Sequence, residues 1–564
     1  MTHDEILTPA FAAGVAANQA ERRAAGLREF DYIVCGAGTS GSVVARRLAE
    51  NPAVTVLLLE AGGNDVAASV SDPLLWQANL GGARDWGFVA EPSPHLNGRA
   101  MPLSMGKGLG GGSSINAMMW SRGHQTDWDH FAQETGDPGW GYESVLGMYR
   151  RIEDWQGAPD PLRRGRGGLF PVETAQDPHP LATAMLHGAA DAGVPTFADP
   201  NGAMMEGAGG AALCNVTIRD ATRSSIFRRY VYPVMAQPNL TVLTHALVTR
   251  ILIERRQAVG VEVLLDNQRI QVRARCETIL SLGAINTPKL LLQSGIGDAA
   301  QLRPHGIALA EHLPGVGQNF QDHVMAAGCG WASPEPLVPR NNQCEATFFW
   351  KSDPQLDTPD IQAILVELPG GVQDPGAPLA ESWKLLPGLV RPKSRGAITL
   401  TSPDPLQPVR IEAQALADPD DVAALVRGVT LCREIANGAA MAPFNRGEVA
   451  PGNLTGAALE AFVRESAATV WHQAGTAKMG RDAMSVVDAE LRVYGIANLR
   501  IADASIMPRV TTGNTMAPCV VIGERLATFL TATQGGARPG VHAYDELPAD
   551  EDRSRQIEDA LGRC

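Results

Sequence analysis

Near its start the chain alternates between apolar runs and a helical pattern. Residues 30–35 (FDYIVC) and 54–60 (VTVLLLE) are short runs of β-type residues, and the second is almost entirely apolar. A strand that is buried on both faces of a parallel sheet has this pattern. Residues 40–50, between the two runs, have the spacing of a helix. The three segments together predict a strand–helix–strand unit of about thirty residues.

Similar patterns return later in the chain. Residues 240–265 and 270–281 are rich in β-branched residues and predict further strands. A short apolar run at 499–502 predicts another strand, and a loop separates it from an apolar helix that we predict at 516–530. Elements of both kinds therefore alternate, which indicates an α/β fold.

The central stretch, residues 326–470, has a weaker pattern and more proline. Within it we predict strands at 360–368 and 396–401. The tail after Gln534 is polar, so we expect it to be ordered only where another segment holds it. The sequence contains no internal repeat.

Length and charge narrow the classes of function. With 564 residues and 59.8 kDa the chain is too long for one core, so we expect two or more lobes. A formal net charge of -14 disfavours nucleic acid and anionic membranes as partners, because both need basic patches. No apolar segment of the sequence is long enough to span a bilayer.

Cysteine usage and the N-terminal segment bear on location. The eight cysteines are scattered without a CxxC pair, which suits reduced thiols in a cytosol. Residues 1–29 lack the basic stretch and the apolar stretch of a signal peptide. We therefore expect a cytoplasmic protein, and the sequence leaves its oligomeric state open.

A GxGxxG loop follows the first predicted strand. Gly36 permits a tight turn, Gly38 lets the backbone approach a pyrophosphate, and Gly41 lets the helix pack closely on the strand. The start of the helix then faces the phosphates with its positive end. Glu60 ends the second strand, where an acid takes ribose hydroxyls and disfavours a 2′-phosphate. The loop predicts an adenine dinucleotide other than NADP, but it does not separate NAD from FAD.

Two more glycine-rich blocks lie further along the chain. Residues 106–116 (GKGLGGGSSIN) suit a backbone that lies against a flat ring or a phosphate, and equally a flexible loop. Residues 283–297 (GAINTPKLLLQSGIG) suit a binding segment, and equally a plain capped helix. Composition alone does not decide either case.

In combination and in order, these blocks resemble the two signatures of the glucose–methanol–choline (GMC) family of FAD-dependent oxidoreductases. Residues 471–480 (WHQAGTAKMG) and 499–518 (LRIADASIMPRVTTGNTMAP) look like the active-site segments of that family. The resemblance runs from about residue 32 to residue 530. It is closer to choline dehydrogenases and bacterial alcohol oxidases than to glucose oxidase.

The resemblance implies an α/β fold with a Rossmann-type FAD-binding domain and a discontinuous α+β substrate-binding domain. The FAD-binding domain would consist of residues 28–62, 105–130, 210–325 and 470–535. The substrate-binding domain would consist of residues 63–104, 131–209 and 326–469. The terminal extensions would be residues 1–27 and 536–564.

It also implies which residues bind FAD. The ADP half would be held by Gly36, Gly38, Thr39, Ser40, Gly41, Glu60 and Ala61. The ring and ribityl chain would be lined by Gly106, Gly110, Gly111, Asn116, Ala117, Met118 and Met119. The adenine, the pyrophosphate and the pyrimidine end would contact Val248, Asp503, Ala504, Thr515 and Met516. Some members tether FAD through a His in the first signature, where this chain has Ile115, so we expect non-covalent FAD.

Two polar residues of the C-terminal segments match the family's catalytic positions. Oxidation of an alcohol needs a base for the hydroxyl proton and a donor for the developing alkoxide, and His472 and Asn514 would supply them. Without the resemblance, His472 is one of twelve histidines and is more often a core residue, and Asn514 after Gly513 is a plausible turn. No HExxH or GxSxG motif indicates a metal site or a hydrolase.

The substrate is less defined. Trp471 either forms a flat wall that suits an aryl or furanic alcohol or packs between the lobes. Glu367 either supplies a charge for a choline-type cation or faces solvent. A small-molecule alcohol is the expected substrate, and oxygen or a quinone-type compound the expected electron acceptor. The alternatives are a choline-type dehydrogenase, a lyase or light-driven decarboxylase on the same scaffold, and an NAD-dependent dehydrogenase suggested by the first loop alone.

Overall fold

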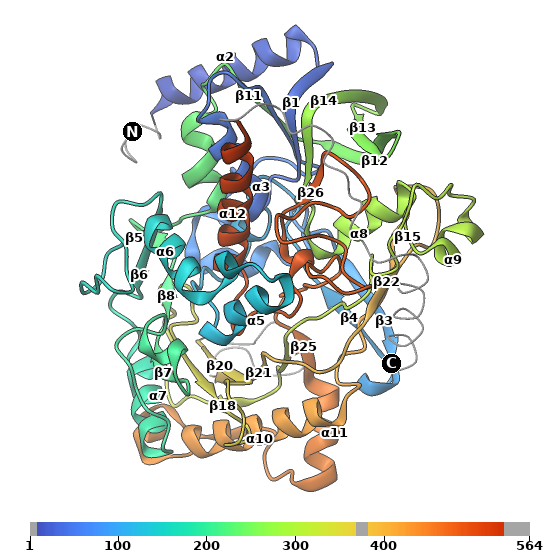
Figure 1. Ribbon diagram of the computed structural model, residues 1–564. Helices are drawn as coiled ribbons and strands as arrows, with labels where there is room; N and C mark the ends of the chain where they lie inside the picture. The colour runs from blue at the N-terminus through green and yellow to red at the C-terminus, as the bar shows by residue number, and fades with distance from the viewer. Residues whose placement is uncertain (1–7, 368–381, 535–564) are drawn as a thin grey trace.

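The computed structural model describes residues 8–367 and 382–534, and two sheets organise it. In Figure 1 the first sheet lies in the upper half of the molecule and the second in the lower half. The strands of the first sheet come from three separate stretches of the chain, and the second sheet uses stretches between them. The fold is therefore α/β, with lobes that are discontinuous in sequence.

The first sheet has seven strands. Their order is β11 (Leu240–Leu243), β2 (Val56–Leu59), β1 (Glu29–Cys35), β14 (Gln268–Leu280), β13 (Gln257–Leu265) and β12 (Ala246–Glu254). β26 (Leu499–Ile501) pairs in parallel with the end of β14. Each residue of β2 is buried, which agrees with the apolar run in its sequence and its central place in the sheet.

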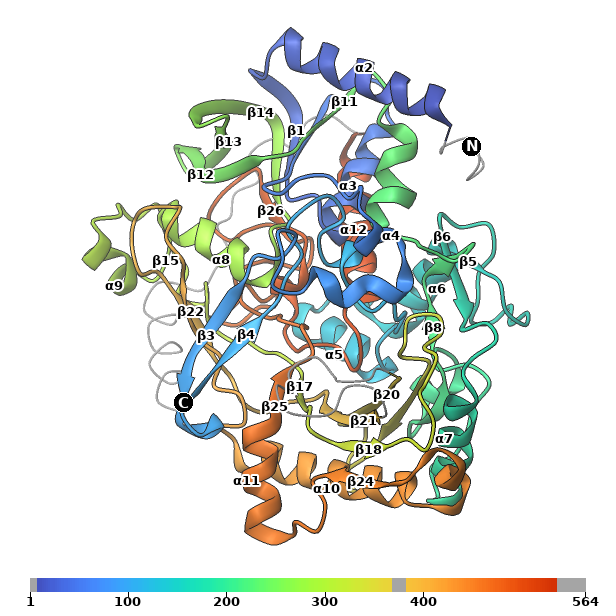
Figure 2. The same ribbon diagram turned by 180° about the vertical axis from the view of Figure 1, so that it is seen from behind.

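Two helices pack closely beside this sheet. α3 (Thr39–Ala49) joins β1 to β2 and completes the predicted strand–helix–strand unit. α12 (Met516–Gln534) lies against α3, and both views show them side by side (Figures 1 and 2). Gly523 allows this contact, because a Cβ at that position would lie 2.8 Å from the backbone oxygen of Ser40.

The N-terminal helix α2 (Pro9–Ala25) lies along the edge of the first lobe (Figure 1). Its Asn18 side chain donates hydrogen bonds to the carbonyl oxygens of Met235 and Gln237, and Val15 is buried. The segment that we predicted as an N-terminal extension is thus anchored to the lobe by polar contacts. Of the two predicted extensions, residues 1–7 and 536–564 lie outside the described residues.

The second sheet has eight antiparallel strands. Its main path is β24 (Gly447–Ala450), β18 (Gly330–Ala332), β21 (Ser382–Leu389), β20 (Ile361–Val366), β19 (Ala346–Trp350) and β7 (Gly210–Leu213). β17 (Val324–Ala326) pairs with β21 and with β25 (Ala467–Thr469).

Two helices cover the outer face of this sheet. α10 (Pro419–Ala436) packs on β21, and α11 (Gly456–Ser466) packs on α10 along the lower edge of Figure 2. The sequence analysis did not predict α10, although its signals are present. The Asp418 side chain caps the helix, Pro419 occupies the first turn, and Val422, Leu425 and Val429 form a buried stripe.

The remaining elements connect the lobes. The helices are α4 (Ala68–Ser71), α5 (Gln125–Thr135), α6 (Tyr142–Ile152), α7 (Pro180–Asp191), α8 (Gly283–Gln293) and α9 (Ala299–Leu302). The strands include β3 (Phe88–Ser93), β4 (Arg99–Leu103), β5 (Glu153–Trp155), β6 (Phe170–Thr174), β10 (Thr222–Arg223), β22 (Ala397–Thr399) and β23 (Arg410–Glu412).

Most predicted elements are present, with shifted ends. The strands predicted at 360–368 and 396–401 are the shorter β20 and β22, and Leu368 lies outside the described residues. The segment predicted as β-rich at 240–265 divides into three strands because tight turns interrupt it. α12 runs four residues beyond the predicted end at 530.

Gly41 tests how closely α3 must pack on β1. A Cβ on Gly41 would lie 2.0 Å from the backbone oxygen of Gly36, which cannot move without opening the loop. We expect Gly41→Ala to destabilise the protein by about 1–3 kcal/mol, as overpacking does, and to lower Tm. The matched control is Gly14→Ala in α2, where a Cβ meets nothing within 4 Å. Equal Tm values for the two variants in thermal unfolding would contradict this account.

Candidate active site and cofactor cavity

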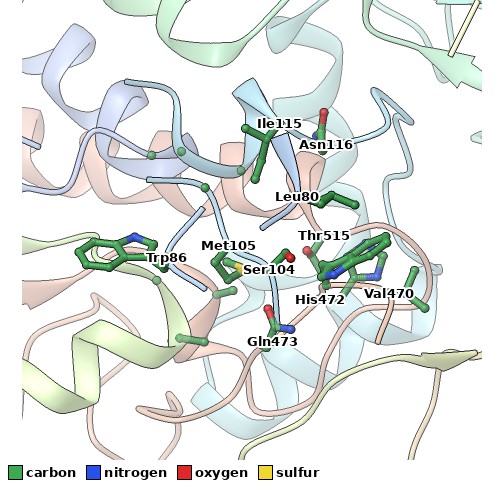
Figure 3. A pocket seen from close by; sticks show the side chains of 18 of the residues that line it. Leu80, Trp86, Ser104, Met105, Ile115, Asn116, Val470, His472, Gln473 and Thr515 are labelled. Atoms are coloured by element: carbon green, nitrogen blue, oxygen red, sulfur yellow. The ribbon is translucent and has the colours of Figure 1, made fainter. Parts of the chain in front are cut away.

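A cavity of about 980 Å³ lies between the two sheets. Its walls come from the loops that follow β1 and β2 and from the facing strands β20 and β21. Open α/β sheets bind ligands at the carboxyl ends of their strands, which is where this cavity begins. Figure 3 shows Trp86 at one end of the cavity and His472 at the other. The cavity therefore has two distinct ends, as the site of an extended ligand does.

The loop after β1 is held by backbone contacts and by Glu60. Gly36 has a φ of 100°, and a Cβ on it would lie 2.3 Å from the backbone oxygen of Ser281. The Glu60 carboxylate accepts hydrogen bonds from the backbone N–H groups of Ala37 at 3.0 Å and Gly62 at 2.8 Å. Burial raises the pKa of Glu60 to about 7. These contacts fix the turn and place the acid beside it.

Three glycines expose backbone to the cavity. A Cβ built on Gly38, Gly112 or Gly283 meets nothing within 4 Å, and all three residues line the cavity. They belong to the three glycine-rich blocks of the sequence. No side chain caps the start of α3, so the first N–H groups of this helix remain for a phosphate. This cradle fits an adenine dinucleotide.

Most residues that we predicted for the site line this cavity. They are Gly36, Gly38, Thr39, Ser40, Glu60, Ala61, Gly106, Gly111, Asn116, Ala117, Met119, Val248, Trp471, His472, Asp503, Ala504, Asn514, Thr515 and Met516. Gly41, Gly110, Met118 and Glu367 do not line it. Gly41 and Gly110 support the loops instead, because a Cβ on either would collide with a neighbouring residue.

Glu367 lies behind the cavity wall. Ile364 and Val366 of β20 line the cavity, and the next residue of an extended chain turns to the opposite side. Burial and the adjacent Glu345 carboxylate raise the pKa of Glu367 to about 9, so it is neutral at pH 7. The structure does not bring this side chain to the site, and a neutral acid does not balance a cation.

Asp322 organises the turn that carries His472. Its carboxylate accepts hydrogen bonds from the backbone N–H of His472 at 2.8 Å and from the side chains of Thr469 and Gln473. Trp471 has a φ of 61°, a conformation that a bulky residue rarely adopts. Strain of this kind persists only where surrounding contacts determine it, and it concentrates at functional sites.

The His472 ring lies between two polar side chains. Its Nδ1 is 2.9 Å from Nδ1 of His323, and its Nε2 is 3.4 Å from Nδ2 of Asn514. Burial lowers the pKa of His472 to about 3. Burial and the neighbouring His472 ring also lower the pKa of His323. Both rings are therefore neutral at pH 7, and each has one N–H and one lone pair.

Contacts beyond Asn514 decide where the proton on His472 lies. The Thr347 hydroxyl donates to the carbonyl of Ala363 at 2.8 Å, so it accepts from the Gln362 amide, whose Nε2 is 3.5 Å away. The same Nε2 donates to Oδ1 of Asn514 at 3.2 Å. Asn514 then turns its NH₂ toward His472, whose Nε2 must present a lone pair.

It follows that the proton of His472 lies on Nδ1 and is donated to His323. Sequence analysis missed His323 and Gln362, because neither lies in a segment whose pattern indicates chemistry. His323 sits directly after Asp322, and only the pairing of β17 with β25 brings it beside His472. The order of residues in the chain gives no sign of this pairing.

Two tryptophans form an aromatic corner near the histidine. Trp471 and Trp76 pack edge to face, with ring centroids 6.4 Å apart and an interplanar angle of 76°, and both line the cavity. The Trp76 indole N–H donates to the carbonyl of Asn342 at 3.1 Å, which leaves its ring apolar toward the cavity.

Other classes of site find no support in the described ranges. Among residues 8–367 and 382–534, no group of three or more His, Cys, Asp or Glu side chains is placed to hold a metal ion. No helix in the same part of the chain combines the length and apolar character needed to cross a membrane.

The sheet, the glycine cradle and the neutral histidine at the far end of the cavity fit an oxidoreductase that binds an adenine dinucleotide. Sequence comparison agrees: the N-terminal and C-terminal models of the GMC oxidoreductase family match residues 30–325 and 392–523. The chain belongs to the GMC oxidoreductase family. It is an FAD-dependent enzyme of the alcohol oxidase or dehydrogenase class.

Relatives match along nearly the whole chain. An alcohol dehydrogenase [acceptor] from Pseudomonas putida is 36% identical over 533 residues, which cover 89% of this chain and 95% of the relative. An oxygen-dependent choline dehydrogenase from Citrobacter koseri is 38% identical over 545 residues, covering 91% and 97%. The crystal structure of pyridoxine 4-oxidase from Mesorbium loti superposes with a TM-score of 0.86 at 30% identity, covering 89% and 99%.

Gly38 tests whether this cradle holds FAD. A Cβ on Gly38 meets nothing within 4 Å and Gly38 lines the cavity, so Gly38→Val places a branched side chain where we expect the cofactor to bind. We expect a folded protein that retains less than about a tenth of the wild-type flavin. Flavin absorbance per chain measures the loading, and circular dichroism checks the fold. A fully loaded, yellow variant would refute the placement of the nucleotide.

Proposed function

We propose that the protein oxidises a primary alcohol to an aldehyde, with His472 as acid/base and Asn514 as the residue that orients the alkoxide. The observation that carries this proposal is the contact between His472 and Asn514 on the wall of the FAD cavity, with 3.4 Å between Nε2 and Nδ2. An unprotonated nitrogen and an amide donor thus face the same space. One can take the hydroxyl proton and the other can bind the oxygen that loses it.

Burial makes His472 ready to accept a proton. With its pKa lowered to about 3, the ring keeps the Nε2 lone pair free at pH 7. The Nδ1–H bond to His323 fixes the ring and spreads the positive charge once Nε2 is protonated. The developing alkoxide next to Nε2 favours the charged imidazolium, so the histidine becomes more basic as the proton moves.

Asn514 and Gln362 position the substrate oxygen. The Gln362 amide holds Oδ1 of Asn514, so the NH₂ group is directed toward the site throughout the reaction. A donor that is already oriented stabilises charge without reorganisation. FAD, when bound, would supply the acceptor for the hydride that leaves the α-carbon. The two polar residues thus handle the proton and the oxygen, and the cofactor handles the electrons.

The wall of the cavity favours an aryl or furanic alcohol. Trp76 and Trp471 offer flat apolar surfaces at right angles near His472, and Ile364, Val366 and Leu386 line the facing strands. A planar ring beside a primary alcohol would bury its faces against these side chains. Oxidation can continue to the acid where the aldehyde is hydrated.

A choline-type alcohol is the second candidate, because a relative at 38% identity carries the name choline dehydrogenase. The two tryptophans could contact a trimethylammonium group. Among the described lining residues the carboxylates are Glu60, Asp503 and Glu465. Glu60 and Asp503 accept hydrogen bonds from backbone N–H groups, and Glu465 is paired with Arg99 and Asn97. Because each of these carboxylates already has hydrogen-bond or ion-pair partners, the lining supports a neutral substrate over a cationic one.

The proposal extends to the cofactor and its acceptor. We assign the ADP half to the loop around Gly38 and to Glu60, and the ring end to residues 106–119, 503–504 and 514–516. The binding is non-covalent, because Ile115 has no nucleophile to offer. Oxygen or a quinone-type compound reoxidises the cofactor. We keep the division into an FAD-binding and a substrate-binding domain, except that β7 and most of β17, which we predicted in the FAD-binding domain, pair within the second sheet.

The direct test is anaerobic mixing of the purified protein with benzylic, furanic, aliphatic and choline-type alcohols. We expect the flavin absorbance to bleach fastest with benzylic or furanic alcohols, because their rings fill the aromatic corner. Recovery with peroxide in air marks oxygen as the acceptor, and recovery only with a quinone marks a dehydrogenase. A flavin that bleaches with none of these alcohols would contradict the proposal, and fastest bleaching by choline would favour the second candidate.

Removal of the His472 ring tests its role. We expect His472→Ala to slow flavin reduction by the alcohol about 10²–10⁴-fold, because the proton acceptor is lost, while FAD stays bound. His130→Ala is the control, since His130 lies on α5 and pairs with Glu134 outside the cavity lining. Stopped-flow absorbance gives both rates. Wild-type reduction in His472→Ala would remove this residue from the mechanism.

A further inference from the structure

Arg223 lies directly behind the glycine-rich block of residues 106–116. It is 2% exposed, and its guanidinium reaches past β10 into the back of this block. Nη1 donates to the carbonyl oxygen of Asn116 at 2.6 Å and to Oδ1 of the same residue at 2.7 Å. Nε donates to the carbonyl of Val70 at 2.7 Å. All these acceptors are neutral.

The charge of Arg223 has no carboxylate partner among the described residues. The nearby Asp65 is engaged by Arg228, whose Nε lies 2.6 Å from Oδ2. Burial, with Arg228 adding repulsion, lowers the pKa of Arg223 to about 9, so it is still a cation at pH 7. Its Nη2 finds no hydrogen-bond partner within the described ranges. An unpaired buried cation is costly, and a nearby negative charge would offset that cost.

The guanidinium also sets the orientation of Asn116. Since an arginine only donates, the amide atom that faces it must be Oδ1, and the backbone N–H of Met118 donates to the same oxygen at 3.0 Å. The NH₂ group of Asn116 is therefore turned toward the cavity, where it lies 3.1 Å from the sulfur of Met516, a weak acceptor. Figure 3 shows the Asn116 side chain in the cavity wall.

We propose that Arg223 is an electrostatic positioning residue for FAD: its fixed charge, with the Asn116 amide in front of it, stabilises the reduced ring system. The inference rests on the proposed placement of the ring against residues 106–119. A hydride from the alcohol carbon brings two electrons and adds one negative charge to the ring, while the hydroxyl proton passes to His472. A buried cation one side chain away balances that added charge.

The test compares the two-electron reduction potential of FAD in wild type, Arg223→Met and Arg223→Lys. Photoreduction against reference dyes gives the potential without any alcohol. We expect Arg223→Met to lower the equilibrium constant for FAD reduction at least tenfold. For a two-electron couple this corresponds to a reduction potential that is lower by about 30 mV. Arg223→Lys keeps the charge and should stay within threefold of wild type. Arg229→Met removes a neighbouring half-buried cation that does not contact Asn116, and its potential should match wild type.

Three results would overturn the inference: a wild-type potential in Arg223→Met, an equal loss in the lysine variant, or an equal loss in Arg229→Met. If Arg223→Met does not fold or retain FAD, Asn116→Asp provides the second readout. It places a carboxylate at the position that is 2.7 Å from Nη1 and neutralises the arginine where it stands. We expect the equilibrium constant for FAD reduction to fall at least tenfold in this variant. An unchanged potential would refute the role of Arg223. Because no alcohol enters these measurements, failure to oxidise any alcohol would overturn the proposed function alone.

Discussion

Direct contact between backbone segments at the glycine blocks is the constraint on which the cavity depends. A Cβ on Gly41 would lie 2.0 Å from Gly36, and one on Gly111 would lie 2.8 Å from Gly38. Two distant segments of the chain therefore meet with no side chain between them. This contact sets the distance between the nucleotide loop and the block that faces the ring.

The second determinant is burial at the far end of the cavity. His472 is 8% exposed, and within the described ranges its ring hydrogen-bonds to a histidine and an amide. A carboxylate in place of His323 would raise the pKa of His472 by favouring the imidazolium. A neutral partner keeps the ring unprotonated and still supplies an acceptor for Nδ1–H. His472 thus has a low affinity for protons before the reaction, and its bond to His323 can stabilise the positive charge when the substrate ionises.

Sequence patterns located the glycine loop and Glu60, which line the cavity, but they missed several residues around His472. The GxGxxG loop, Glu60 and the adjoining strands are neighbours in the chain, so local rules of turns and pleats place them. His323, Gln362 and Trp76 lie more than a hundred residues away in sequence from their partners His472, Asn514 and Trp471, so only the tertiary fold brings them together. The position of Glu367, in contrast, follows from the local sequence. Ile364 and Val366 of β20 line the cavity, and the next residue of an extended chain turns to the opposite side, behind the wall. Asp418 and Pro419 mark the start of helix α10. We did not predict this helix, because the central stretch is rich in proline and has a weak pattern.

Charge is distributed unevenly along the cavity in a way that matches the reaction. Lys107 lies over the Trp86 ring at 4.8 Å at the nucleotide end, and Arg223 is buried behind the middle block. The groups that we assign to the reaction near His472 carry no charge: the two histidines, the Asn514 and Gln362 amides and the two indoles. In the proposed reaction, hydride transfer would move negative charge from the substrate toward the cofactor, and proton transfer would move positive charge toward His472. Fixed cations on the proposed cofactor side and a neutral base on the substrate side would lower the free energy of this separated state relative to the starting one, because each developing charge would meet a group that is already in place.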